Sequence, residues 1–360
     1  MVAPRPRDLR RLLAQAYPWV KAPFIVGAPM RVMSGPSLAV AVSSAGGLGF
    51  IGPTVKAEDL FSDLEKAGGL IRLSPLASAP RCSTAALLPI GVGFQTWNGD
   101  LKVALSAVQE HRPCAVWLFA PRHGQNELDE WTTGVREASP ETQIWIQVGT
   151  LGEANDAVRS STPPDVLVIQ GAEAGGHGRA KDGLGTMALF PEIADATRES
   201  GIPLIAAGGI VDGRGVAAAL SLGAAGVAMG TRMLAATETR ISKGYQNEVI
   251  RATDGATSTV RTQLYNHLRG TFGWPEQFSP RGLINRSWVD HQDGIPFDEL
   301  KRLHDEAVKS GDAGWGPEGR LATYAGAAVG LVHSVDDAGA IIESVRGEAK
   351  DIISFLANDL

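Results

Sequence analysis

Short apolar runs recur along the chain, and stretches with helical character separate them. The runs are continuous and do not alternate with polar residues, which is typical of strands buried on both faces of a parallel sheet. We predict strands at Pro23–Ala28, Leu48–Ile51, Leu88–Gly93, Ala115–Phe119, Gln143–Val148, Val166–Gln170, Pro203–Ala207 and Gly226–Gly230. Helices are predicted between them at Ser37–Ser44, Ala57–Lys66, Asp100–Glu110, Asn126–Glu137, Leu151–Ser160, Ala188–Glu199 and Gly213–Leu222.

A strand followed by a helix, repeated eight times, is the pattern of a closed (β/α)8 TIM barrel, a fold of the α/β class. Such a barrel takes about 250 residues, and the chain has 360. The alternative is a doubly wound open sheet, which often carries a G-x-G-x-x-G turn after its first strand. No such turn follows Pro23–Ala28, so the pattern favours the barrel.

The pattern changes beyond the eighth strand, where polar residues predominate and aromatic residues are scattered among them. No parallel strand is evident in residues 237–321. We therefore predict a barrel formed by residues 1–236 and completed by residues 322–360, with a mostly helical subdomain inserted at 237–321. Tyr324–Leu331 is predicted as the last barrel helix, and Val335–Leu356 as a terminal amphipathic helix.

Composition and charge exclude several classes of protein. Hydrophobic residues make up 44% and charged residues 20% of the chain, which excludes global disorder. The net charge is −6 and no block of Lys and Arg occurs, so we predict no nucleic-acid partner. No uncharged apolar run reaches the roughly 20 residues of a membrane span. The charged segment Met1–Lys21 also lacks the apolar core of a signal peptide, so we expect no membrane association.

The two cysteines, Cys82 and Cys114, have no paired spacing, which argues against a disulfide framework and a Cys-based metal site. No cluster of His, Asp and Glu has the spacing of a metal-ligand set, so we predict no metal. This cysteine usage fits a reducing compartment, and we expect a cytoplasmic protein.

The loops that follow the strands carry the chemistry of a barrel. Gly208 and Gly209 follow the seventh strand, and Gly230 and Thr231 follow the eighth. Glycine removes the Cβ that would keep an anion away from backbone N–H groups, and barrels often bind phosphate on these two loops. The pattern therefore predicts a phosphate site, for either a cofactor or a phosphorylated substrate.

His177 lies in a Gly-Gly-His-Gly segment after the sixth strand. The glycines would let the main chain approach a flat ligand, and an imidazole can take or give a proton near neutral pH. A surface histidine without function is the alternative interpretation. His123, which follows the fourth strand, is a weaker candidate because its neighbourhood reads equally well as a solvated loop.

The chain resembles the nitronate monooxygenase family, formerly called 2-nitropropane dioxygenases. The segment from Gln170 to Gly178, with sequence QGAEAGGHG, is close to the most specific motif of the family. The order and spacing of four other segments also agree with the family, namely Ala28-Pro29-Met30, Ala45-Gly46-Gly47-Leu48-Gly49, Ala206-Ala207-Gly208-Gly209-Ile210 and Met229-Gly230-Thr231-Arg232. One departure is that Ala327 and Ala328 follow Gly326, where the family often has a polar residue.

The resemblance implies a barrel that holds FMN noncovalently, with His177 as the catalytic base. It implies that the flavin phosphate is bound by Gly208, Gly209, Gly230 and Thr231. It implies that the flavin ring and ribityl chain are surrounded by Ala28, Pro29, Met30, Gln95, Gln147 and Gln170. It also implies that Gly175 and Gly176 line the approach to the ring. Family members oxidise alkyl nitronates, and in some cases neutral nitroalkanes, with O2 to a carbonyl compound and nitrite.

Other functions remain open at this point. The flavin-dependent enoyl-acyl-carrier-protein reductases look similar, share the Gly-Gly-His segment and take hydride from NAD(P)H. A flavin-binding protein without catalysis and a barrel without flavin are further alternatives. We expect a small-molecule substrate together with O2, and a homodimer is one of the assemblies that the sequence allows.

Overall fold

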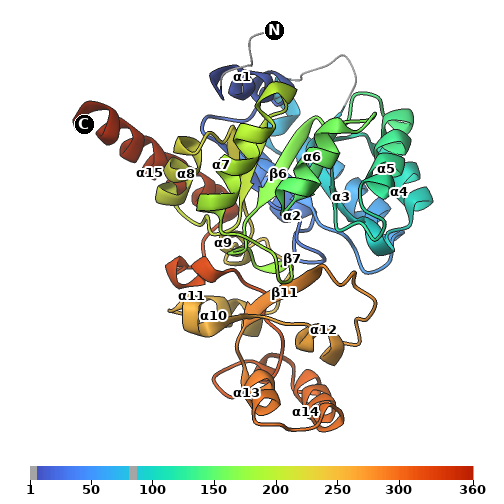
Figure 1. Ribbon diagram of the computed structural model, residues 1–360, viewed down its shortest axis with the longest axis vertical. Helices are drawn as coiled ribbons and strands as arrows, with labels where there is room; N and C mark the ends of the chain where they lie inside the picture. The colour runs from blue at the N-terminus through green and yellow to red at the C-terminus, as the bar shows by residue number, and fades with distance from the viewer. Residues whose placement is uncertain (1–5, 81–86, 360) are drawn as a thin grey trace.

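Eight parallel strands close into a barrel in the computed structural model, which describes residues 6–80 and 87–359 (Figure 1). The bounds of the barrel strands are β1 Phe24–Gly27, β2 Leu48–Ile51, β3 Leu88–Gln95, β4 Pro113–Phe119, β5 Gln143–Val148, β6 Val166–Gln170, β8 Leu204–Ala207 and β9 Gly226–Met229. Strand β1 pairs with both β2 and β9, and this double pairing closes the ring. All eight predicted strands are present, and the predicted (β/α)8 barrel is confirmed.

Helices surround the barrel, and all seven that the sequence predicted between strands are present, six of them within three residues of their expected ends and α3 extending six residues further. Their bounds are α2 Pro36–Ser44, α3 Asp59–Arg72, α4 Leu101–His111, α5 Gln125–Ala138, α6 Leu151–Arg159, α7 Thr186–Ala196 and α8 Gly213–Ser221. The eighth outer helix is the terminal helix α15, Ala338–Asp359, which packs against α8 and α2. Arg346 of α15 donates hydrogen bonds to the carbonyls of Ala45 and Gly46 at 3.1 and 2.8 Å, which fixes this helix to the barrel.

The predicted last barrel helix at Tyr324–Leu331 is wrong. Only a 3-10 helix, η5 Ala327–Leu331, occurs there. The N–H of Gly326 donates to Thr231 Oγ1 at 2.9 Å and the N–H of Ala327 donates to the carbonyl of Glu173 at 2.8 Å. Because these N–H groups dock the segment onto the barrel loops, they are not available for an α-helical ladder.

The end of the barrel opposite the catalytic loops is filled. Helix α1, Pro6–Ala16, lies against this end, and Leu13 and Tyr17 are buried there. The Tyr17 hydroxyl accepts a hydrogen bond from Trp145 Nε1 at 2.8 Å, and Trp145 stacks on Trp117 with ring centroids 5.7 Å apart. Large aromatic side chains therefore fill the barrel interior at the α1 end. The opposite end, beside the insert, is left for a ligand.

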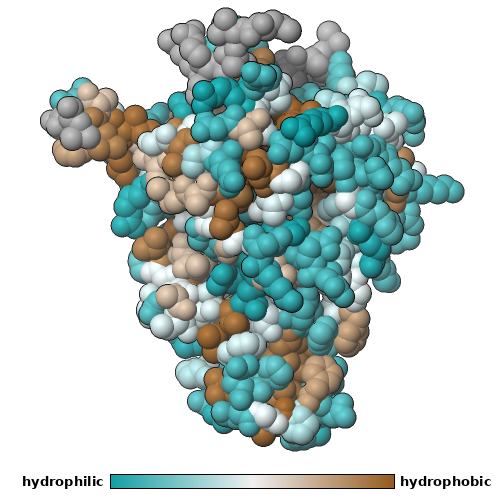
Figure 2. All heavy atoms as spheres, viewed as in Figure 1, coloured by the Kyte–Doolittle hydropathy of each residue, from teal (hydrophilic) through white to brown (hydrophobic). Residues whose placement is uncertain are grey.

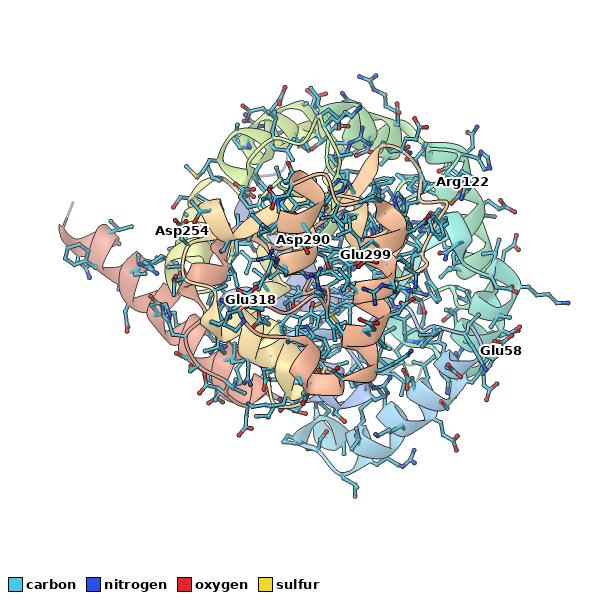
Figure 3. All side chains as sticks on the ribbon, turned by 90° about the horizontal axis from the view of Figure 1, so that it is seen from below. Glu58, Arg122, Asp254, Asp290, Glu299 and Glu318 are labelled. Atoms are coloured by element: carbon cyan, nitrogen blue, oxygen red, sulfur yellow. The ribbon has the colours of Figure 1, made fainter. Side chains whose placement is uncertain are left out.

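The inserted segment after β9 has more residues in helices than in strands, and it covers one end of the barrel (Figures 1 and 3). The short helix α9 Thr231–Leu234 precedes it, and its own helices are α10 Lys243–Arg251, α11 Gly255–Ser258, α12 Leu264–Leu268, α13 Arg286–Gln292, α14 Phe297–Lys309 and the 3-10 helix η4 Gly311–Gly314. Short 3-10 helices in the barrel are η1 Pro75–Ser78, η2 Thr96–Asn98 and η3 Arg198–Ser200. The view in Figure 3 shows the barrel helices as a ring around the insert.

A small antiparallel sheet, which the sequence pattern did not predict, joins the insert to the loop after β6. Strands β10 Thr259–Arg261 and β11 Phe278–Leu283 come from the insert, and β7 Gly176–Arg179 comes from the loop after β6. Pro280 of β11 lies opposite His177 of β7. Pairing with β11 therefore makes the Gly-Gly-His-Gly segment part of a strand, which the sequence pattern did not predict.

The described residues contain no helix that is both long and apolar enough to cross a membrane. The visible surface is mainly polar, and apolar side chains gather at the free end of α15 (Figure 2). Ile353, Phe355 and Leu356 are exposed there. Cys114 of β4 is buried, whereas Cys82 lies outside the described residues.

Candidate active site

One cavity of about 720 Å³ lies between the carboxyl ends of the barrel strands and the insert. Its wall contains every residue that the sequence placed at the site, namely Ala28, Pro29, Met30, Gln95, Gln147, Gln170, Gly175, Gly176, His177, Gly208, Gly209, Gly230 and Thr231. His123 is elsewhere, exposed at the start of α5. The structure thus brings residues from the carboxyl ends of six barrel strands and the loops after them to one wall.

The turn after β8 has a backbone that suits an anion. Gly208 and Gly209 have φ of 96° and 76°, a region that L side chains rarely adopt. Among the residues that the structure describes, the N–H groups of Gly209 and Thr231 have no hydrogen-bond partner. A Cβ at Gly230 would extend toward Met30 and Ala28, both in the cavity wall, without touching other atoms closely. Unpaired N–H groups beside open space can donate hydrogen bonds to a phosphate.

Glu173 fixes the shape of this turn. Its carboxylate accepts hydrogen bonds from the backbone N–H of Thr186 at 2.9 and 3.0 Å and from the Thr186 hydroxyl at 3.1 Å. The same hydroxyl lies 3.1 Å from the carbonyl of Gly208. Glu173 therefore contacts the Gly208 turn indirectly, through Thr186.

Gln147 of the cavity wall has a buried amide nitrogen without a partner among the described residues. Trp117 Nε1 donates to Gln147 Oε1 at 3.0 Å, which fixes the orientation of the amide, and Gln147 Nε2 is buried with no partner among the described residues. A buried unsatisfied donor is costly unless a ligand completes it. The polar edge of a flavin ring offers such acceptors, so the residues present fit a flavin.

His177 is held on two sides. Its ring stacks on Trp274 with centroids 3.5 Å apart and an angle of 8° between planes. Asn266 Nδ2 lies 2.9 Å from His177 Nε2, and Asn266 Oδ1 accepts the Tyr324 hydroxyl at 3.0 Å. Since the amide N–H faces Nε2, that nitrogen is the acceptor, and Nδ1 carries the proton in the neutral ring. Asn266 therefore sets the tautomer.

The imidazole is neutral over the physiological range. Desolvation, followed by the positive charges of Arg261, Arg269 and Arg31, lowers the pKa of His177 from 6.5 to about 3. The hydrogen bond from Asn266 opposes this shift only in part. A neutral imidazole beside several guanidinium groups makes a site that accepts small anions.

The sequence model of the nitronate monooxygenase family matches residues 128–271. A nitronate monooxygenase of Metarhizium robertsii, npaC, is 68% identical over 347 residues, which are 96% of this chain and 96% of that protein. This chain belongs to the nitronate monooxygenase family. A nitronate monooxygenase of Neurospora crassa is 33% identical over 94% of this chain and 92% of its own length.

Nitronate monooxygenase family membership confirms the resemblance seen in the sequence and makes the chain an oxidoreductase. The family is flavin-dependent, which agrees with the unpaired Gln147 amide and the open turn after β8. Among solved structures, FabK from Thermotoga maritima superimposes with a TM-score of 0.71 and 25% identity, over 97% of this chain and 99% of that one. The barrel and its insert therefore recur together in another protein.

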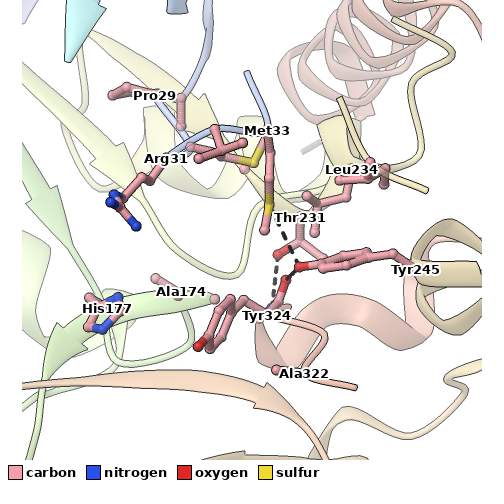
Figure 4. A pocket seen from close by; sticks show the side chains of 18 of the residues that line it. Pro29, Arg31, Met33, Ala174, His177, Thr231, Leu234, Tyr245, Ala322 and Tyr324 are labelled. Carbon is pink, nitrogen blue, oxygen red and sulfur yellow. Dashed lines mark hydrogen bonds between the residues drawn. The ribbon is translucent and has the colours of Figure 1, made fainter. Parts of the chain in front are cut away.

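Sequence reasoning missed the residues that the insert and the β1 loop bring to His177. Arg31, Asn266, Arg269 and Tyr324 all line the cavity, and Figure 4 shows the side chains of Arg31 and Tyr324 extending toward His177. Arg31 directly follows Met30, so its place after a barrel strand was a usable signal. Asn266 and Arg269 come from the insert, where no pattern indicated which residues return to the barrel. The described residues contain no group of three or more His, Cys, Asp and Glu side chains that could hold a metal ion.

Proposed function

We propose that this protein is an FMN-dependent enzyme that oxidises alkyl nitronates with O2 to a carbonyl compound and nitrite. The observation that carries the proposal is a single cavity that joins an open turn with unpaired N–H groups to a neutral imidazole among arginine charges. Thr231 of the turn and His177 lie on different sides of this cavity (Figure 4). The turn suits a phosphate tail, and the arginine-flanked imidazole suits a small anion such as a nitronate.

The cavity wall has a role for each part of FMN. Gly208, Gly209, Gly230 and Thr231 would hold the phosphate through backbone N–H groups. Gln95, Gln147 and Gln170 would bind the polar edges of the ring and ribityl chain, and the flat approach would be formed by Ala28, Pro29, Met30, Gly175 and Gly176. When bound, the flavin supplies the electron acceptor and the reaction with O2.

His177 would act on the substrate from a fixed orientation. Its Nδ1–H can donate a hydrogen bond to a nitronate oxygen, because Asn266 occupies Nε2. Removal of the α-proton from a neutral nitroalkane is also assigned to His177, and it requires Nε2 to be released by Asn266. An imidazole whose pKa is about 3 is a weak base. We therefore expect nitronates to react much faster than neutral nitroalkanes.

An oxygen electrode tests this function. The purified flavin-loaded protein is mixed with ethyl nitronate or with propionate-3-nitronate, and O2 uptake and nitrite release are followed together. We expect both signals with each nitronate, and slow uptake with nitroethane at a pH where it is neutral. O2 uptake without nitrite, or no uptake with any nitronate, would overturn the proposal.

The competing activity is reduction of an enoyl thioester with NAD(P)H. It is measured on the same preparation by the loss of NAD(P)H in the presence of a short enoyl thioester. Rapid, substrate-dependent loss together with inactivity toward nitronates would assign the protein to the reductases instead.

A further inference from the structure

We propose that Trp274 is a positioning residue, which fixes the plane of the His177 ring and shields one face of that ring from water. Trp97 and Arg122 in turn hold Trp274 in place. The proposal rests on the proposed function only for its effect on turnover, because the packing of the two rings does not depend on the reaction. The indole carries no group that titrates, so Trp274 acts through the imidazole.

The contact between the two rings is close and flat. Trp274 and His177 have ring centroids 3.5 Å apart and planes 8° from parallel. Both side chains are half-buried, and both belong to the cavity wall. By contrast, the Tyr324 ring lies 6.1 Å from the same imidazole at an angle of 48°, so it does not stack on it. The indole therefore covers one face of the imidazole.

A stacked neighbour and a hydrogen-bonded neighbour restrict different motions of the imidazole. Stacking fixes the plane of a ring but permits rotation within that plane. The contact between Asn266 Nδ2 and His177 Nε2, at 2.9 Å, fixes this rotation. With both contacts in place the ring has one orientation, and its Nδ1 edge is left for a ligand. Loss of Trp274 would release the plane of the ring.

A single short segment of the insert supplies both contacts. Asn266 lies in α12, and Trp274 lies in the connection between α12 and β11. The N–H of Thr271 donates to the carbonyl of Asn266 at 2.8 Å, so the connection turns back onto the helix. Strand β11 then pairs with β7, and Pro280 lies opposite His177. The segment is thus fixed to the strand of His177 as well as to its ring.

Trp274 is supported by two residues that follow the barrel strands β3 and β4. Trp97 of η2 packs on Trp274 with ring centroids 4.9 Å apart. Arg122 donates from Nη2 to the carbonyl of Gly273 at 2.8 Å. The Arg122 guanidinium also lies 5.4 Å from the centre of the Trp97 ring, a favourable cation–π distance. One arginine therefore holds both the residue before Trp274 and the ring that packs on it.

The loop after β4, which carries this arginine, is itself fixed. Ala120 has φ of 59°, a region that residues other than glycine rarely adopt. Its carbonyl accepts the N–H of Trp97 at 3.2 Å, and the carbonyl of Pro121 accepts Gln277 Nε2 at 3.4 Å. Such a backbone persists where surrounding contacts fix it. The support is therefore rigid, as a positioning role requires.

The indole cover favours the neutral imidazole. Desolvation is the largest of the effects that lower the pKa of His177 to about 3. The charged and titratable groups around the ring are Arg261 of β10, Arg269 after α12, Arg31 after β1, and Tyr324. Replacing Trp274 with a small residue leaves these groups in place and admits water to one face of the ring, so the pKa of His177 should rise. The lost contact between a protonated ring and the indole acts the other way, but by less than burial does.

Histidine NMR spectra test the proposal without any turnover. The purified protein is labelled with isotopic histidine, and the signal of His177 is the one absent from His177→Asn. In the wild type we expect this signal to carry a ring-current shift from the indole and to stay constant between pH 8 and pH 4.5. In Trp274→Ala the ring-current shift should disappear, and the titration midpoint should rise by about one pH unit or more. Trp274→Phe should restore most of both properties.

Trp288→Ala is the matched control, because it removes another indole that lies beside a histidine of the insert. Trp288 is half-buried on α13, its ring centroid lies 5.9 Å from that of His291, and it is not part of the cavity wall. The His177 signal should not change in this variant. An unchanged His177 signal in Trp274→Ala, or equal changes in both variants, would overturn the proposal.

Arg122→Gln tests the support of Trp274, and it also decides the matter if Trp274→Ala does not fold. Arg122 is exposed, so its replacement should change the melting temperature little. We expect the His177 signal to lose part of its ring-current shift. Arg302→Gln is the control, since Arg302 is exposed on α14 and pairs with Glu299 and Glu306. Identical His177 signals in the two variants would contradict the role of Arg122.

Kinetics with ethyl nitronate relate the ring packing to turnover. We expect kcat of flavin-loaded Trp274→Ala to fall by about tenfold or more, with a smaller change in KM, because a ring free to tilt no longer presents Nδ1–H in a fixed direction. Trp274→Phe should recover most of the rate. If the NMR changes are found and the wild type does not oxidise nitronates, only the proposed function is wrong. If nitronates are oxidised equally fast by the wild type and Trp274→Ala, the positioning role is wrong.

Discussion

His177 combines two properties that decide which substrate the site can use. Its ring is neutral, since burial and nearby arginines lower its pKa to about 3, and its Nε2 is occupied by Asn266. For His177→Asn we expect turnover of a neutral nitroalkane to fall by about a hundredfold or more, the contribution typical of a general base. Turnover of the preformed nitronate should fall less, because no proton has to be removed. Parallel assays with nitroethane and ethyl nitronate measure both, and equal losses would contradict the assignment as base.

The same low pKa makes the folded protein sensitive to acid. In the unfolded chain an ordinary histidine has a pKa of 6.5, whereas His177 in the folded protein has a pKa of about 3. Between these values the unfolded state binds a proton that the folded state does not, so stability falls as the pH drops from 6.5 toward 3. His177→Asn should therefore lose less stability than the wild type over this window. Urea denaturation at pH 7 and pH 5 tests the difference, and identical losses would contradict it.

Asn266 is a positioning residue for His177. Replacing it with aspartate puts a carboxylate beside Nε2, and an opposite charge at this distance raises the pKa of the imidazole. We expect the pH profile of kcat/KM for a nitronate to gain an inflection at a higher pH in Asn266→Asp. We also expect the ratio of nitroalkane to nitronate turnover to rise. Asn266→Ala is the control, since it removes the same contacts without adding a charge. The same profile in both variants would rule out this role.

At the level of elements, the turns after β8 and β9 form the proposed phosphate cradle. A side chain at Gly230 would enter the space beside Met30 and Ala28, and the backbone there does not require glycine, since φ is −104°. We expect Gly230→Val to lower flavin occupancy several-fold with little change in the melting temperature of the apoprotein. Gly347→Val on α15, where a Cβ also meets open space, is the control. Full occupancy with unchanged affinity in Gly230→Val would remove the cradle from the account.

Arg261 links the β7–β11–β10 sheet to the loop after β6 by hydrogen bonds. Arg261 of β10 donates to the carbonyls of Ala172 and Ala174 at 3.1 Å and of Gly176 at 3.3 Å. Burial lowers the pKa of Arg261 to about 10, so the group remains charged at pH 7. Arg261→Met removes these hydrogen bonds, although the carbonyl of Ala172 still accepts one from Arg281 Nε at 3.2 Å, and we expect the free energy of unfolding to fall by about 2 kcal/mol.

Two further readouts accompany this variant. Loss of the Arg261 charge should also raise the pKa of His177, because Arg261 is the first of the charges that lower it. Arg302→Met, in an exposed network on α14, should change stability little. If the Arg261→Met protein is as stable as the Arg302→Met protein, the hydrogen bonds from Arg261 to the loop between β6 and β7 do not contribute to stability.

The barrel could be predicted from the sequence because its rules are local and repeated. Continuous apolar runs mark each strand, and Gly208 and Gly230 mark loops at the carboxyl ends of the strands. All residues predicted for the site line one cavity for the same reason, since every barrel loop opens at the same end. Their individual roles stay predictions.

The rest of the site could not be predicted because it depends on contacts between distant segments. Strand β7 exists only because β11, about a hundred residues later, pairs with it. Asn266 and Arg269 reach His177 through the fold of the insert, and helical periodicity does not determine which face returns to the barrel. The prediction of a helix at Tyr324–Leu331 was wrong for the same reason. The N–H groups of Gly326 and Ala327 donate to Thr231 and Glu173, which are distant in the sequence. Cytoplasmic location and a homodimer stay predictions.

For the whole molecule, the central claim is that a flavin in this cavity accepts electrons from a nitronate. The most direct measurement is the visible spectrum of the purified protein, recorded without oxygen before and after addition of ethyl nitronate and again after air is admitted. We expect a flavin spectrum that changes on mixing with the nitronate and returns with O2, and we expect the released cofactor to be FMN. A flavin spectrum that does not change with the nitronate but bleaches with NAD(P)H would contradict this claim. So would a purified protein that never contains flavin.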